Sequence, residues 1–194
     1  MSPAAHALDR RLHSLRAGHD AVTTALGELE GDETYQLLAV RGGLSGTTAA
    51  RLRPALDRLV ELRPGLPLLQ ELIEWASGLR SSTSMDDHRA TELVSLLNSP
   101  SLVVPLPSAG PQATRTVAPQ DLLDSLERAI EPLRGLVGDV ADAWRSLPAQ
   151  LEEATAEADR LAFDMPSVRS VADARTKLAD LPPRVVHDLS LIHI

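Results

Sequence analysis

The sequence predicts an all-α protein in which long helices with a heptad pattern fold back on one another as antiparallel hairpins, forming a coiled-coil-like bundle. Three observations support this class. Apolar residues make up 43% of the 194 residues, enough for a core, yet only 2% are aromatic. Leucine, alanine, glutamate and arginine, all strong helix formers, dominate the composition. Apolar residues also recur at steps of three and four, the spacing of one helix face.

The first heptad stripe predicts a helix over residues 5–29, which Gly31 and Asp32 end. Its one polar member is His19, and a polar residue in such a stripe commonly fixes the register of packing. A pH-dependent switch is the alternative, because histidine titrates near neutrality. The stripe consists of Ala5, Leu8, Leu12, Leu15, His19, Val22, Leu26 and Leu29.

A second apolar stripe runs from Leu52 to Ala76 and is interrupted at residues 63–67, where two prolines stand. Proline removes a helical hydrogen bond and clashes with the preceding turn, so we expect a kink or a stop there. Ser84, followed by Asp87, predicts the cap of a short helix that ends near Asn98. Residues 1–98 are thus expected to form an N-terminal helical hairpin region.

Residues 99–118 contain four prolines and are expected to form an extended loop that lies along the helices. A long helix follows from Pro119 and ends at residues 164–166; Ser167 can cap a last helix to about Asp180. Residues 119–188 are therefore expected to form a C-terminal hairpin region. The stripe of the long helix consists of Leu126, Ile130, Leu133, Val137, Val140, Trp144, Leu147, Leu151, Ala154, Ala158 and Leu161.

The last six residues, 189–194, resemble the translation of a transposase adaptor used in sequencing libraries. Two of the four isoleucines in the chain, Ile192 and Ile194, lie in this run. We therefore expect residues 189–194 to be a non-native tail, and we expect the natural protein to continue beyond Asp188.

Charge and composition exclude several classes of function. The net charge of −8 disfavours binding to nucleic acid, and the absence of cysteine excludes disulfides and thiolate chemistry. No run approaches the roughly 18 apolar residues of a membrane span, and residues 1–11 contain no apolar core of a secretory signal. We expect a cytoplasmic protein that binds neither nucleic acid nor membranes.

Few residues offer catalytic or metal-binding chemistry. His6 and His13 lie seven residues apart on one helix face and could hold a metal between two chains, but two surface histidines are the simpler interpretation. Residues 43–46 are one residue short of a nucleophile elbow and lack the lysine of a phosphate loop. We predict no catalytic, cofactor-binding or metal-binding residue and no cofactor. The paired acids are expected on solvated faces: Asp121 and Asp124, Asp139 and Asp142, Glu152 and Glu153.

Four short segments carry motifs that can be compared with those of known proteins: Gly46–Arg51, Val103–Pro105, Asp121–Leu123 and Ala143–Trp144. In these motifs the chain resembles uncharacterised helical, coiled-coil proteins of high-GC actinobacteria. The excess of 18 arginines over the single Lys177 is in keeping with a GC-rich genome. The resemblance implies a helical fold and no particular activity or site residue.

Long heptad stripes with little catalytic chemistry favour a non-enzymatic structural or protein–protein interaction module. The expected partner is another protein, or a second copy of the chain bound through the stripes. The alternative is that the chain is the helical regulatory or oligomerising arm of an enzyme that continues beyond Asp188.

Overall fold

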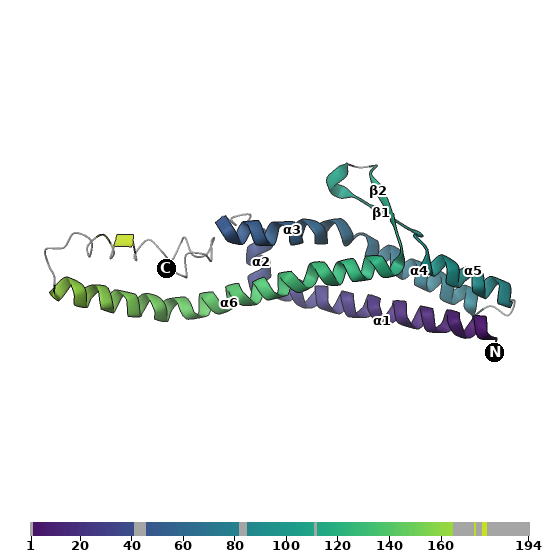
Figure 1. Ribbon diagram of the computed structural model, residues 1–194, viewed down its shortest axis with the longest axis horizontal. Helices are drawn as coiled ribbons and strands as arrows, with labels where there is room; N and C mark the ends of the chain where they lie inside the picture. The colour runs from purple at the N-terminus through teal and green to yellow at the C-terminus, as the bar shows by residue number, and fades with distance from the viewer. Residues whose placement is uncertain are drawn as a thin grey trace. The chain divides into compact units, whose positions relative to one another are not determined.

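The computed structural model describes residues 2–40, 46–81, 85–110 and 112–164, together with Asp173, Thr176 and Lys177. It confirms the all-α class, since helices dominate and one small hairpin supplies the described strands (Figure 1). The elements are α1 (Pro3–Gly31), α2 (Glu33–Val40), α3 (Gly46–Leu62), α4 (Gly65–Arg80), α5 (Asp87–Asn98), β1 (Leu102–Pro105), the 3-10 turn η1 (Pro107–Ala109), β2 (Thr114–Val117) and α6 (Pro119–Asp164).

The chain divides into two compact units. The first comprises residues 1–31 and 55–132, and the second comprises residues 32–54 and 133–194. Helix α1 packs against α4 and α5 to form the centre of the first unit. The apolar stripe predicted for α1 faces this core, and the His19 side chain within it is only 13% exposed. The buried residues of the stripe are Leu8, Leu12, Leu15, Val22, Leu26 and Leu29.

The interruption predicted at residues 63–67 is a stop, because α3 ends at Leu62 and α4 begins at Gly65. Gly65 lies where the chain packs closely against other elements. A Cβ atom on Gly65 would lie 2.7 Å from Leu122 Cδ2 and 3.2 Å from Val104 Cγ2. Glycine at this position therefore lets α4 approach α6 and β1 within the first unit.

The cap predicted for α5 is wrong by two residues. The N-cap is Asp86, and its carboxylate accepts a hydrogen bond of 2.8 Å from the backbone N–H of Arg89. Asp86 directly precedes the first helical residue, which is the position from which a short side chain reaches the third backbone N–H of the helix. Ser84 lies outside the described residues.

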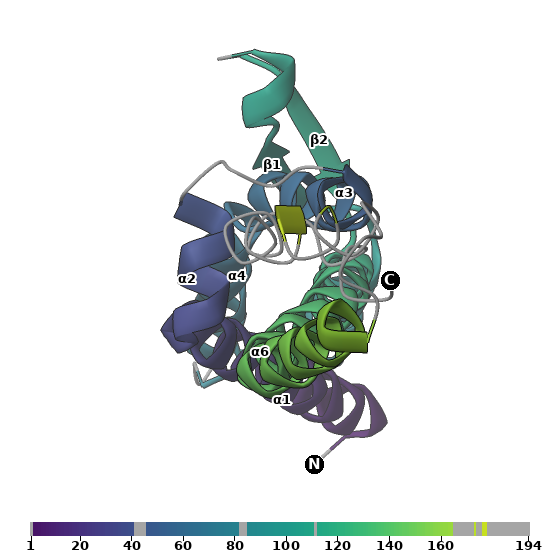
Figure 2. The ribbon, with the colours of Figure 1, turned by 90° about the vertical axis from the view of Figure 1, so that its left-hand side faces the viewer.

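The extended loop expected to lie along the helices is instead a β-hairpin, in which the two strands satisfy each other's backbone hydrogen bonds. Strand β1 pairs antiparallel with β2, with Leu102 opposite Val117. Leu102 and Val104 are buried, and β1 contacts α4. Figures 1 and 2 show the hairpin projecting from the helices of the first unit, and Ser108 at its turn donates a 2.6 Å hydrogen bond to Glu61 of α3.

In the second unit, the stripe of α6 is buried at Leu133, Val137 and Val140. Further along, Trp144, Leu147 and Leu151 are only half-buried. The helix predicted over 167–180 and the tail 189–194 lie outside the described residues, apart from Asp173, Thr176 and Lys177, which are helical. Among the helices that the structure describes, none is both long enough and apolar enough to cross a membrane.

Candidate functional site

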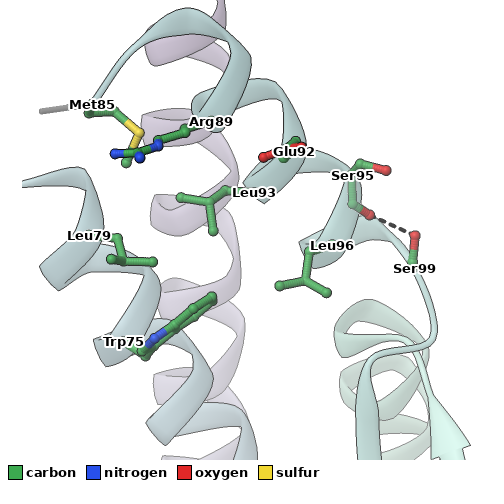
Figure 3. A pocket seen from close by; sticks show the side chains of 9 residues that line it. All are labelled: Trp75, Leu79, Met85, Arg89, Glu92, Leu93, Ser95, Leu96 and Ser99. Atoms are coloured by element: carbon green, nitrogen blue, oxygen red, sulfur yellow. Dashed lines mark hydrogen bonds between the residues drawn. The ribbon is translucent and has the colours of Figure 1, made fainter.

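A groove of about 680 Å³ lies between α4 and α5 in the first unit (Figure 3). Its walls come from two helices and from the residues that flank α5. The lining residues are Trp75 and Leu79 of α4, Met85 before α5, Arg89, Glu92, Leu93, Ser95 and Leu96 of α5, and Ser99 after it. Both walls therefore belong to regular helices that the first unit holds in place.

The groove gathers apolar side chains that are open to solvent. Trp75 is 50% exposed, Leu79 is 39% exposed and Leu96 is 37% exposed. Trp75 and Leu79 stand one turn apart on α4 and face Leu93 and Leu96 across the groove (Figure 3). Most large exposed apolar residues of a protein stand singly, so a cluster of this kind marks a candidate binding surface.

The cluster arises because the apolar stripe on each helix is wider than the core that covers it. On α4, Leu69 and Ile73 are buried in the core, whereas Trp75 and Leu79 lie beside that buried face. On α5, Leu93 is buried and Leu96, three residues later, is not. The apolar side chains that the core leaves exposed on the two helices face each other and form the groove.

Polar groups border the apolar surface. Arg89 and Glu92 lie on α5, and Oε1 of Glu92 lies 3.2 Å from Nε2 of His88 on the same helix. Ser99 donates a 2.7 Å hydrogen bond to the backbone carbonyl of Ser95 (Figure 3).

Helix α4 is fixed to α1 by polar contacts outside the groove. Arg80 donates hydrogen bonds of 2.8 and 3.0 Å to the two carboxylate oxygens of Asp9. Arg16 donates a 2.9 Å hydrogen bond to Ser77. The hydrogen bonds to Asp9 raise the pKa of Arg80, so the guanidinium stays charged. None of these contacts uses a residue that lines the groove.

The residues considered for chemistry from sequence lie elsewhere. His6 and His13 are exposed on α1, and the three pairs of acids on α6 are exposed as expected. Residues 43–45 lie outside the described residues. Within the described ranges, no group of three histidine or carboxylate side chains is placed to hold a metal ion.

The groove itself was missed from sequence. The available signal was the position of Trp75 and Leu79, two large apolar residues that fall outside the stripe from Leu52 to Ala76. Compared with protein-family models, curated proteins and solved structures, the chain matches none of them.

Proposed function

We propose that this chain is a non-enzymatic protein-interaction module and that the α4–α5 groove binds the apolar face of a helix from another protein. The cluster of Trp75, Leu79 and Leu96 carries the proposal, because it offers contiguous apolar surface between two fixed helices. Apolar grooves between helices typically accept an amphipathic helix through anchors spaced at i, i+3, i+4 and i+7.

The openness of the groove favours a helix over a small molecule as the ligand. Half of the Trp75 side chain is exposed, whereas small-molecule sites bury most of their ligand. Tryptophan is enriched among the residues that dominate binding energy, which makes Trp75 the expected anchor.

The experiment uses Trp75 as its reporter. Trp144→Phe leaves Trp75 as the single tryptophan of the chain. A neutral, helix-forming peptide of about 18 residues with a leucine stripe is titrated, and a saturable shift of Trp75 emission is expected. Leu79→Asp should weaken binding about tenfold or more, because it places a charge in the apolar contact.

The matched control is Val60→Asp, which makes the same type of change at a residue of α3 that is 60% exposed and does not line the groove. This variant should bind the peptide as the unchanged chain does. Equal binding by the Leu79→Asp and Val60→Asp variants, or no binding by any of the three proteins, would reject the groove as the site.

We also propose self-association through the second half of the α6 stripe, in the manner of a coiled coil. Half-buried Trp144, Leu147 and Leu151, with Leu161 at 39% exposed, favour it because they keep heptad spacing. Sedimentation equilibrium of the full chain should then give a dimer that Leu147→Asp combined with Leu151→Asp converts to a monomer. A dimer that persists in this variant would exclude the α6 stripe as the contact.

A further inference from the structure

We infer that the helix bound by the α4–α5 groove is basic: an amphipathic helix of another protein that carries lysine and arginine beside its apolar stripe. This inference rests on the proposed function of the groove and adds the charge of the partner. The observation behind it is the distribution of charge around the apolar lining.

The segment that forms the groove, residues 65–99, is strongly acidic. It contains five carboxylates against two guanidiniums, a net charge of −3 with His88 neutral. One guanidinium, Arg80, is bound to Asp9 of α1. The carboxylates are those of Glu71, Glu74, Asp86, Asp87 and Glu92, and all five residues are exposed.

One of these carboxylates lines the groove, and three others belong to residues next to lining residues. Glu92 lines the groove directly. Glu71 stands one turn before Trp75 on α4, so the two side chains are neighbours on the helix surface. Asp86 and Asp87 lie at the start of α5, beside the lining residue Met85. A basic helix would place its cations against acidic groups along both walls, with Arg89 as the cation among the lining residues.

The same charges disfavour two other occupants. A second copy would use the same groove on both chains in a two-fold dimer, and the two acidic segments would then face each other. An anionic lipid surface would be repelled for the same reason. Charge complementarity therefore selects a cationic partner helix.

The test compares three peptides on the full-length chain carrying Trp144→Phe. All three share one leucine stripe. The polar face carries lysine and arginine in the basic peptide, glutamine and serine in the neutral peptide, and glutamate and aspartate in the acidic peptide. At about 25 mM salt the basic peptide should bind about tenfold tighter than the acidic peptide, and at about 500 mM this ratio should fall below about threefold, because salt screens exposed charges.

Charge reversal on the groove should reverse the preference. Glu71→Lys combined with Glu92→Lys is expected to make the acidic peptide the tighter ligand at low salt. The control is Glu127→Lys combined with Glu131→Lys, the same change in charge at exposed residues of α6 that do not line the groove. This control should keep the original order of affinities.

The outcomes separate the inference from the proposed function. Equal binding of all three peptides, abolished by Leu79→Asp, would overturn the basic partner and leave the helix groove intact. Binding of the basic peptide alone that is unchanged by Leu79→Asp would overturn both, since the contact would then be electrostatic and outside the groove. A dimer of the full chain that Leu79→Asp dissociates would assign the groove to a second copy and overturn the inference.

Discussion

The apolar stripe of α1 in the first unit and the later part of the α6 stripe in the second unit are buried to different extents. In the first unit, Leu8, Leu15 and Val22 of α1 are almost entirely buried. In the second unit, Trp144 and Leu151 of α6 also belong to a heptad stripe but are only half-buried. Heptad spacing thus specifies which face of a helix is apolar, and the neighbouring chain decides whether that face becomes core.

The ion pairs of the two units also differ, because some join two helices and others lie within one helix. In the first unit, Arg80 of α4 contacts Asp9 of α1. In the second half of α6, Arg145 contacts Asp142 and Arg160 contacts Glu157, each pair one turn apart. Contacts between helices fix their packing, whereas pairs within one turn stabilise only the local helix. The first unit is therefore the better platform for a site that depends on the geometry of two helices.

The largest expected effect compares equal truncations in the two stripes. Leu15→Ala should lower the free energy of unfolding by about 2–5 kcal/mol, because Leu15 is fully buried. Leu151→Ala should lower it by about 1 kcal/mol or less, since a half-buried leucine loses less contact. Urea unfolding followed by circular dichroism measures both. Similar losses for the two variants would mean that the two stripes are equally covered.

The next comparison applies one substitution at both ends of α4. Gly65→Ala should destabilise the first unit by about 1–3 kcal/mol, because the new methyl group would press on Leu122 and Val104. Gly78→Ala should stabilise it by about 0.5–1 kcal/mol, because alanine favours the helix and Gly78 faces open space. The midpoints of urea unfolding should move in opposite directions. A shift of the same sign in both variants would contradict the close packing at Gly65.

A smaller effect is expected at Arg11, which joins three helices of the first unit. Its guanidinium donates hydrogen bonds of 3.1 Å to Gln120 of α6 and 3.3 Å to the backbone carbonyl of Leu97 in α5. Burial lowers the pKa of Arg11, and the nearby carboxylate of Asp124 opposes the shift. In the described part of the chain, the buried Nε has no hydrogen-bond acceptor. Arg11 thus combines stabilising contacts with a cost of burial.

Because of that balance, Arg11→Met should cost less than about 1 kcal/mol, since methionine keeps much of the apolar stem and removes the buried charge. Arg11→Ala should cost about 1–2 kcal/mol, because packing and hydrogen bonds are both lost. Thermal unfolding of the two variants measures which substitution lowers the stability more. Equal destabilisation would show that the polar contacts, and not the stem, account for the contribution of Arg11.

Much of the fold followed from local patterns in the sequence. The apolar spacing identified the buried face of α1, and Pro64 predicted the break between α3 and α4. The β-hairpin was missed because its strands are four residues each and the turn lacks an Asn-Gly or Asp-Gly pair. The groove was missed for a different reason. The position of Trp75 and Leu79 outside the stripe indicates only that they need not face the core. Where α5 packs beside them to form the groove is not contained in the spacing of residues within α4.

The smallest expected effect concerns a local pair near the end of α6. Arg160 donates hydrogen bonds of 2.9 and 2.6 Å to the carboxylate of Glu157. These bonds lower the pKa of Glu157 below its ordinary value. A carboxyl with a lowered pKa in the folded state stabilises that state above its unfolded pKa, and the contribution is lost as the pH falls through the folded value.

Carbon-13 NMR titration of the Glu157 carboxyl in the full chain measures this directly. Arg160→Gln should move the pKa of Glu157 back up, and Arg160→Lys should give an intermediate value, because lysine cannot donate two parallel hydrogen bonds to one carboxylate. The effect on overall unfolding should be barely measurable, since exposed pairs of this kind contribute little. A large loss of stability on Arg160→Gln would show that this end of α6 depends on more than local helix contacts, which would weaken the contrast between the two units.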